Sequence, residues 1–253
     1  MTIKEKVVIF PDIHFPNHDE GAFQCALRVV KLVKPTGFLL LGDTIDGESV
    51  SHWQWKRKKR PPLEYQLPII EKEVKQGNEG LDRIDKVLDK VGCKKKIFTQ
   101  GNHELWFDNF VEEYPYLPHY TSERAFRFNE RGYEWHPYGK ITKIFDSKLY
   151  AYHGGHYMGI SHARTHALQI GCNIIYGHTH DCQKATIQHI DGPHMAHSMG
   201  CLSNMETANK YLKNRKTNWS HNVGICDIYD NGNFNLTVLT ILDGITTYNG
   251  KIV

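Results

Sequence analysis

Short apolar runs recur along the chain, and most end in glycine or polar residues. Runs of this length, rich in β-branched and aromatic residues, predict buried β-strands. Stretches with helical periodicity, such as residues 21–34, separate the early runs and predict parallel βαβ units. The later runs follow one another closely, and turn signals at residues 230–232 and 248–250 predict hairpins in a mixed or antiparallel half. The expected strands are residues 6–10, 37–42, 95–99, 141–145, 149–153, 173–177, 184–190 and 194–199, followed by a long stretch at residues 223–241.

One long helix is expected between residues 63 and 91. Its apolar positions recur at steps of three and four residues, as in a heptad seam. Pro68 fits the first turn of a helix better than its middle, so we expect the helix to begin near that residue. The seam has two interpretations: it packs on its own domain, which we favour, or residues 67–91 form a coiled-coil contact in a homodimer. The seam consists of Leu67, Ile70, Val74, Leu81, Ile84, Leu88 and Val91, with Gly77 at the one position that lacks an apolar side chain.

Composition sets the outer limits of the interpretation. The 253 residues, 40% of them hydrophobic, are enough for a sizeable core, so we expect a single domain over residues 1–253 with a helical and basic insertion at about residues 48–92. The absence of a long apolar run predicts a cytoplasmic protein without a membrane partner. Six cysteines without a C-x-x-C pair argue against a zinc knuckle. The net charge of +3 depends on one basic run at residues 56–60, without which the chain would be slightly acidic.

Polar side chains gather where five of the expected strands end. Carboxyl ends of strands are where open α/β sheets present their ligand-binding loops, so these side chains are expected to meet. Imidazole nitrogens mixed with carboxylate and amide oxygens suit Mn, Fe or Zn, and the glycines beside them allow close approach of the backbone. The pattern predicts a dinuclear metal site. The pairs are Asp12 with His14, Asp43 with Asp46, Asn102 with His103, His153 with His156, and His178 with His180.

The ordered series D-x-H, G-D-x-x-D, G-N-H-E, H-G and G-H-x-H resembles the motifs of the calcineurin-like metallophosphoesterase family. These motifs span residues 12–180, about two-thirds of the chain. The resemblance implies an α/β fold, a four-layer α/β/β/α sandwich of two mixed sheets with a dinuclear metal site on loops at the strand ends. It implies two divalent metal ions, Mn in the first place and Fe, Zn or Ni as alternatives. One ion would be held by Asp12, His14, Asp43 and His180, and the other by Asp43, Asn102, His153 and His178.

The same resemblance implies a reaction and two catalytic residues. In the family, phosphate esters are hydrolysed by attack of a hydroxide that bridges the metals. The residue equivalent to His103 lies over the phosphate and protonates the leaving oxygen, and Asp46 resembles the carboxylate that orients this imidazole and favours its protonated form. His156, close to the favoured ligand His153, is a candidate for substrate binding. Glu104 is expected to begin a helix and to have no catalytic role.

The sequence indicates the substrate less sharply. The G-N-H-E motif is similar to that of protein serine/threonine phosphatases, but that branch continues G-D-x-x-D with Arg-Gly, whereas this chain has Gly47-Glu48. A guanidinium fork usually holds a monoester dianion, so this departure favours a phosphodiesterase. Tryptophans beside basic residues can stack on bases and neutralise phosphates, which points to DNA or RNA. The residues concerned are Trp53, Trp55, Lys56, Arg57, Lys58, Lys59 and Arg60, with a thinner second example at residues 210–219.

Three functions stay open at this point. The favoured one is a metal-dependent phosphodiesterase or nuclease that acts on DNA or RNA, with the basic loop as its guide. The alternative is a phosphomonoesterase that acts on phosphoproteins or nucleotides, in which case the loop would be a solvated segment with locally packed tryptophans. A non-catalytic scaffold that binds partners through the long helix is less favoured, because every residue implied as a metal ligand is present.

Overall fold

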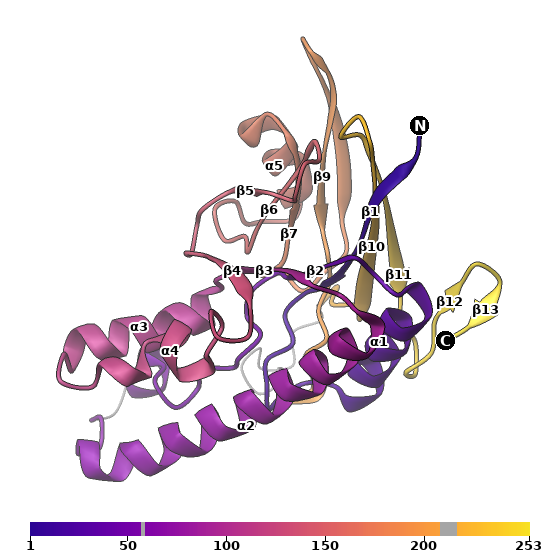
Figure 1. Ribbon diagram of the computed structural model, residues 1–253. Helices are drawn as coiled ribbons and strands as arrows, with labels where there is room; N and C mark the ends of the chain where they lie inside the picture. The colour runs from indigo at the N-terminus through magenta and orange to yellow at the C-terminus, as the bar shows by residue number, and fades with distance from the viewer. Residues whose placement is uncertain (57–58, 208–216) are drawn as a thin grey trace.

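The structure, a computed structural model, describes residues 1–56, 59–207 and 217–253. Two β-sheets stack face to face, and helices cover the outer face of each (Figure 1). This is the α/β/β/α sandwich expected from the sequence. The first sheet has the strand order β11-β10-β1-β2-β3-β4, and the second has the order β5-β6-β7-β9-β8.

The helices are α1 (Glu20–Val33), α2 (Leu63–Val91), α3 (Asn102–Glu113), α4 (Ser122–Phe126) and α5 (His162–Ile170), with 3₁₀ helices η1 (His52–Trp55) and η2 (Pro118–Tyr120). The strands are β1 (Ile3–Phe10), β2 (Gly37–Leu40), β3 (Lys95–Thr99), β4 (Tyr133–His136), β5 (Thr142–Lys143), β6 (Leu149–Tyr152), β7 (Asn173–Tyr176), β8 (Lys184–His189), β9 (Gly192–Ser198), β10 (Asn222–Tyr229), β11 (Phe234–Thr240), β12 (Thr247–Tyr248) and β13 (Lys251–Ile252). No helix in the described ranges is long and apolar enough to cross a membrane.

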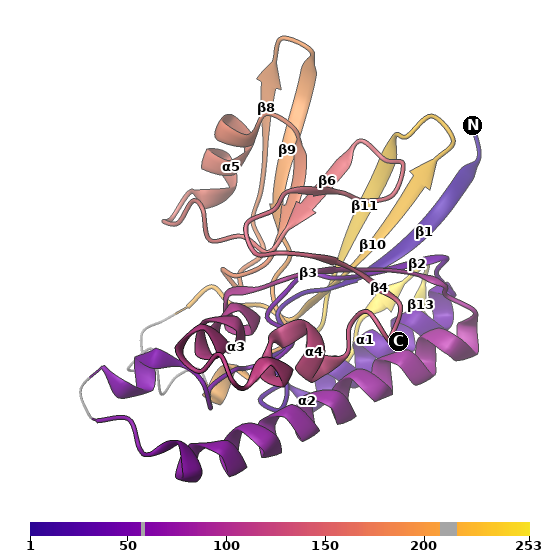
Figure 2. The same cartoon turned by 60° about the vertical axis from the view of Figure 1, so that its left-hand side comes forward.

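The packing explains why the first strands read as unbroken apolar runs. Successive residues of a strand point to opposite faces of the sheet, and here both faces are covered. In β1, Val8 and Phe10 pack against the helices, whereas Val7 and Ile9 pack against the second sheet. Strands β1 to β4 pair in parallel, which confirms the expected βαβ units. On the far side of the sandwich, α5 covers the second sheet (Figure 2).

The C-terminal strands form two hairpins, of which the first extends the first sheet and the second is a separate two-stranded sheet. Strands β10 and β11 are joined at the predicted turn, and β10 pairs antiparallel with β1, so distant parts of the chain meet in one sheet. Strands β12 and β13 are joined at the second predicted turn. Strand β4 was not predicted. The strand expected at residues 141–145 is shorter than expected, because Phe145 turns out of the extended conformation with φ 49°.

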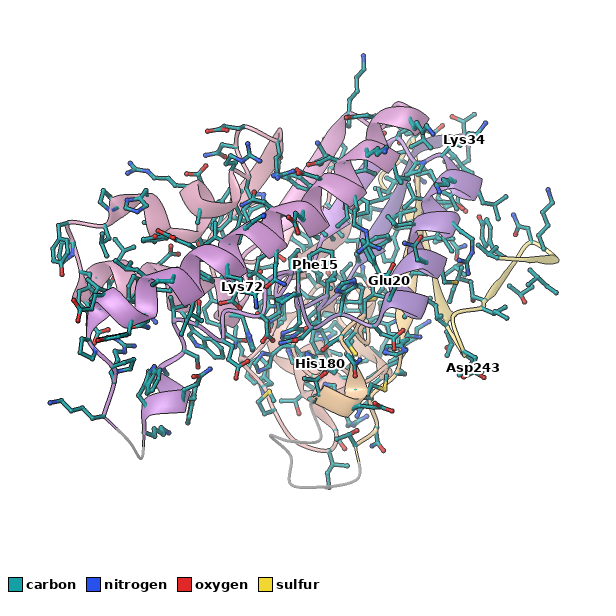
Figure 3. All side chains as sticks on the ribbon, turned by 90° about the horizontal axis from the view of Figure 1, so that it is seen from below. Phe15, Glu20, Lys34, Lys72, His180 and Asp243 are labelled. Carbon is teal, nitrogen blue, oxygen red and sulfur yellow. The ribbon has the colours of Figure 1, made fainter. Side chains whose placement is uncertain are left out.

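Helix α2 buries its heptad seam in its own domain, which was the favoured interpretation. Ile70, Leu81 and Ile84 belong to the core between the helices and the first sheet, so they are not available to a second chain. The packing is close enough that a side chain at Gly80 would collide with the ring of Phe15. Seen from below, α2 crosses this whole face of the molecule in front of Phe15 (Figure 3).

The start of α2 differs from the prediction. The helix begins at Leu63 rather than near Pro68, although an internal proline removes one main-chain hydrogen bond. Contacts with residues 48–49 offset this cost. Gln66 donates to a main-chain carbonyl there at 2.8 Å, and Glu73 accepts from both main-chain N–H groups at 3.0 and 2.9 Å. The early turns of α2 are therefore fastened to the segment that leads into η1.

Candidate metal centre

All seven residues implied as metal ligands come together at one edge of the two sheets. They fall into two groups that share Asp43, as the family resemblance implied. Ligand atoms of Asp12, His14, Asp43 and His180 lie within 4.8 Å of one another, as do those of Asp43, His153 and His178. Asn102 completes the second group. The residues follow directly on β1 (Asp12 and His14), β2 (Asp43), β3 (Asn102), β6 (His153) and β7 (His178 and His180).

In the first group, ring nitrogens and carboxylate oxygens converge on a common space. His14 Nε2 is 3.2 Å from His180 Nε2 and 3.8 Å from Asp43 Oδ2. His180 Nε2 is in turn 3.3 Å from Asp12 Oδ1. Such a set of imidazole nitrogen and carboxylate oxygen donors suits Mn, Fe or Zn.

In the second group, the orientation of His153 is fixed from behind. Its Nδ1 donates to the main-chain carbonyl of Leu41 at 2.9 Å, so its Nε2 faces Asp43 Oδ2 at 3.1 Å. The side-chain oxygen of Asn102 lies 3.2 Å from the same nitrogen and 2.7 Å from His178 Nδ1. Four donor groups thus point into one space.

The backbone at the ligands is held in a conformation that side chains rarely adopt. Positive φ angles cost free energy for residues other than glycine and cluster at functional sites. They are found at Asp12 (36°), His14 (60°), Asp43 (45°), His178 (69°) and His180 (58°). The sharp turn that each strand makes at its end is what swings these side chains into a common space.

Buried atoms without partners show that the site fits positively charged ions. Asp12 Oδ1 accepts from the main-chain N–H of His178 at 2.8 Å, but Asp12 Oδ2 is buried and has no hydrogen-bond partner within the described ranges. The same holds for Nδ1 of His180. A buried carboxylate oxygen left unpaired is costly, and a divalent cation would satisfy it. The donors present therefore fit two divalent metal ions.

The charges around Asp43 keep its carboxylate ionised, which favours a cation next to it. Although burial opposes ionisation, the imidazoles of His103 and His153 hold the pKa of Asp43 well below its usual range. Asp43 in turn overcomes the effect of burial on His153 and raises its pKa to about 10. Burial, and then the neighbouring His153, lower the pKa of His178 to about 4. The negative charge of Asp43 therefore attracts cationic groups into this part of the site.

Glu104 has a structural role that the sequence did not reveal. It stands in the first turn of α3, as expected, but it is fully buried. Its carboxylate accepts from the main-chain N–H groups of Gly101, Asp43 and Ile45 at 2.9, 3.0 and 2.9 Å. Burial, and then the nearby Asp43, raise the pKa of Glu104 to about 7. One side chain thus ties the loop after β2 to the loop after β3.

His103 and Asp46 lie together, but not in the arrangement expected. His103 Nδ1 is hydrogen-bonded to the main-chain carbonyl of Asp46, and His103 Nε2 lies 3.8 Å from Asp43 Oδ2. The carboxylate of Asp46 is 4.0 Å from His103 Nδ1 and bonds elsewhere, to His14 Nδ1 at 3.0 Å and Asn17 Nδ2 at 2.7 Å. The carbonyl of Asp46 therefore orients His103, and its carboxylate orients His14.

A cavity of about 400 Å³ opens above the two groups. We call its metal-facing residues the floor: His14, Asp43, Asn102, His103, His178 and His180. We call its three tryptophans the wall: Trp53 of η1, Trp106 of α3 and Trp219 of the segment before β10. The sequence interpretation named Trp53, included Trp219 only as the end of the thinner basic stretch at residues 210–219, and missed Trp106. Trp106 could have been found, because it lies one helical turn after His103. For Trp219, no local pattern predicts its contact with the floor.

The described residues of the basic run, Lys56, Lys59 and Arg60, do not line the cavity. Lys56 Nζ lies 3.4 Å from the ring centre of Trp53, and Trp55 is half-buried. Arg60 forms an ion pair with Glu113. Lys59 and His156 are exposed, and neither lines the cavity. The remaining candidates, Arg57, Lys58 and residues 210–216, lie outside the described residues.

Comparison with known proteins identifies the family. The model of calcineurin-like phosphoesterases matches residues 5–182. No curated protein matches the sequence. Among solved structures, YfcE, a phosphoesterase from E. coli, has 14% identity and a TM-score of 0.42, and the alignment covers 92% of this chain and 98% of that one.

Two further structures are similarly remote. Vps29 from Chaetomium thermophilum has 10% identity and a TM-score of 0.42, over 93% of each chain. The nuclease MPE from Pseudomonas putida has 11% identity and a TM-score of 0.33, over 87% of this chain and 82% of that one. These values are too low to bear on the substrate. The family model, which spans most of the chain, and the assembled His and Asp clusters carry the identification. The chain belongs to the calcineurin-like phosphoesterase family and is a metallophosphoesterase, a hydrolase of phosphate esters.

Proposed function

We propose that this metallophosphoesterase is a phosphodiesterase that cleaves nucleic acid strands. One observation carries the proposal: the cavity above the metal ligands is walled by three tryptophans, and none of the described residues that line it is Lys or Arg. A binding surface of this kind suits planar bases more than a highly charged phosphate.

The charge of the lining favours a diester over a monoester. A phosphomonoester is a dianion near neutral pH and is usually gripped by guanidinium groups in addition to metals. Here Asp46 and Glu48 line the cavity instead, and carboxylates oppose a second negative charge. A diester carries a single negative charge, so it loses less by the lack of a guanidinium among the described residues of the lining.

The residues of the floor divide the work of hydrolysis. The seven Asp, His and Asn ligands would hold two metal ions, which supply Lewis acidity and a nucleophile at neutral pH. His103 Nδ1 is engaged by the carbonyl of Asp46, which leaves Nε2 facing the cavity. From there a protonated His103 can donate to the leaving oxygen, which is the usual work of a general acid. We propose Mn as the ion that supports activity, since the donor set suits it.

Hydrolysis of a labelled single-stranded oligonucleotide with Mn, beside bis-p-nitrophenyl phosphate and p-nitrophenyl phosphate, tests the proposal. We expect both diesters to be hydrolysed faster than the monoester at equal concentration. His103→Ala should lower kcat for the oligonucleotide by about 10²- to 10⁴-fold. His119→Ala, which changes an exposed histidine away from the cavity, should leave it unchanged. Chelation of the metal should abolish turnover, and added Mn should restore it.

Each of the other possible results would indicate a different function. Faster turnover of the monoester would make the protein a phosphomonoesterase. Hydrolysis of bis-p-nitrophenyl phosphate without any cleavage of DNA or RNA would refute nucleic acid as the substrate. Failure to bind metal after reconstitution would favour the scaffold function.

A further inference from the structure

Two tryptophans of the wall stand directly beside the floor. The ring of Trp106 lies 4.0 Å from the imidazole of His103, centre to centre, at an angle of 33°. The ring of Trp219 lies 4.3 Å from the imidazole of His180 at 60°. His14 lies between these two histidines, with its ring centre 4.5 Å from that of His103 and 5.0 Å from that of His180. The metal ligands are therefore flanked by one tryptophan beside the candidate acid and another beside a ligand of the first metal group.

The backbones of both tryptophans belong to ordered elements, and each ring packs on a floor histidine. Trp106 belongs to α3, the helix that begins with Asn102 and His103, so its position follows from that of the floor. Trp219 forms a β-bridge with Asp181, the residue after His180. Asp181 is itself fixed by His162 on α5, whose Nε2 lies 2.9 Å from its carboxylate. Rigid aromatic side chains lose little conformational entropy when they bind a ligand.

The third tryptophan stands further out. The side chain of Trp53 is 55% exposed, and Lys56 lies over its ring. A cation–π contact at an exposed site stabilises by about 0.5–1 kcal/mol. The contact with Lys56 therefore holds the ring of Trp53 only weakly. This ring contacts His52, whereas the rings of Trp106 and Trp219 contact floor histidines, so Trp53 is placed to contact a strand that leaves the cavity. Trp106 and Trp219 are therefore the side chains that decide what flanks that phosphate.

The form of the nucleic acid follows from this arrangement. Within a duplex, both faces of each base are covered by its neighbours, so a tryptophan can stack only on an unpaired base. Duplex binding depends instead on many Lys and Arg contacts with phosphates. Lys and Arg are lacking among the described residues of the lining, and a cavity of about 400 Å³ accommodates about one or two nucleotides.

We propose that Trp106 and Trp219 stack on the unpaired bases on the two sides of the scissile phosphate, so that the substrate is a single-stranded nucleic acid. This inference rests on the proposed nucleic acid phosphodiesterase activity and adds the residues that select the strand. Because every base has an aromatic face, the selection is for unpaired bases and not for a particular sequence.

The test uses a dinucleoside monophosphate, which has one diester and two bases, and two analogues in which one base or the other is replaced by hydrogen. With wild-type holoenzyme and Mn, loss of a base should raise KM about 5- to 100-fold, as does loss of a stacking aromatic side chain. Trp219→Leu should raise KM for the intact compound by a similar factor and have no further effect on one of the two analogues. Trp106→Leu should behave in the same way towards the other analogue.

Two variants separate stacking from damage to the fold. Trp219→Phe keeps an aromatic ring and should retain most of the affinity. Tyr116→Leu removes an exposed aromatic ring away from the cavity and should change neither KM nor kcat. A single-stranded oligonucleotide should also be cleaved at least tenfold faster than the same labelled strand in a blunt duplex.

The results distinguish this inference from the function on which it rests. If the effect of Trp219→Leu on KM multiplies with the loss of each of the two bases, so that neither analogue hides it, Trp219 does not stack on a base. Equal cleavage of single strand and duplex would also overturn the inference, while the nuclease function would stand. If bis-p-nitrophenyl phosphate is hydrolysed but no nucleic acid compound is, both proposals fail.

Discussion

The floor of the cavity comes from residues that directly follow strands, whereas the wall comes from a 3₁₀ helix, a helix and the segment before β10. Floor residues are buried or half-buried and are fixed by the turn at each strand end, often with positive φ angles. Wall residues are large apolar rings, and one of them is mostly exposed. A site of this kind can keep its chemistry constant while the wall alone determines what enters.

The contrast gives each region its own kinetic signature. A change that disturbs the floor should lower kcat and metal affinity for every phosphodiester, because the reacting groups are misplaced. A change that disturbs the wall should raise KM for substrates that carry bases and leave kcat for a small diester intact. Three residues that support one region or the other test this division.

The largest effect is expected at Glu104, which supports the floor. Glu104→Gln places an amide N–H₂ where a carboxylate oxygen accepted from main-chain N–H groups, so at least one buried donor loses its acceptor. The free energy of unfolding should fall by about 1–3 kcal/mol. Because Asp43 moves with this loop, kcat should fall about 10- to 100-fold for all diesters.

Thermal unfolding and metal analysis, together with kinetics on bis-p-nitrophenyl phosphate, measure these changes. Glu112→Gln on the exposed side of the same helix is the control and should match the wild type. An unaltered kcat in a folded Glu104→Gln protein would show that the loop after β2 is held by other contacts.

A somewhat smaller effect is expected at Asp46. Its carboxylate bonds to His14 Nδ1, which keeps Nε2 of that ring directed at the metal ligands. Asp46→Asn should therefore lower the affinity for metal about tenfold, at the low end of the range for residues that orient a ligand. His103 should be little affected, because it is held by the main-chain carbonyl, which the substitution retains.

Titration of metal binding, with Asp89→Asn on the exposed surface of α2 as the control, gives the answer. Should metal affinity stay the same while the alkaline limb of the pH–rate profile moves, the carboxylate would act on His103, as the family resemblance implied. Both the main-chain carbonyl and the carboxylate of Asp46 would then act on His103.

The meeting of the floor residues could be predicted from the sequence, whereas the wall was predicted only in part, for a physical reason. Each floor residue comes shortly after an apolar strand, so parallel pairing gathers these residues at one edge of each sheet. The stacking of the two sheets then brings together residues as far apart as Asp12 and His180. The contact of Trp219 with His180 depends on how the chain returns to β10, a non-local event without a local pattern. The detailed role of Asp46 was also beyond the sequence, because a carboxylate and a carbonyl of one residue can serve different partners.

The long helix shows the same limit. Four of the seven apolar seam residues are buried and the other three are partly buried against the same core. The start of the helix depended on Gln66 and Glu73, polar residues whose partners lie in the segment before η1. Periodicity identifies an apolar face and is silent about which polar side chains are also buried. For that reason α2 was expected to be a packing element, while its support of the cavity wall went unnoticed.

The smallest effect is expected at Glu73, which supports the wall. Its carboxylate fixes residues 48–49, and this segment leads through Ser51 to Trp53. Glu73→Gln turns one acceptor into a donor that faces a main-chain N–H, so η1 should lose its fixed position. We expect KM for a single-stranded oligonucleotide to rise by a factor of about 2 to 5, the equivalent of one weakened stacking contact at an exposed ring. In contrast to the Glu104 and Asp46 variants, kcat for bis-p-nitrophenyl phosphate should not change, since no floor residue bonds to Glu73. Glu79→Gln, on the exposed face of α2, should alter neither parameter. If Glu73→Gln lowered kcat for the small diester as well, α2 would support the floor too, and the division between floor and wall would not hold on this side of the cavity.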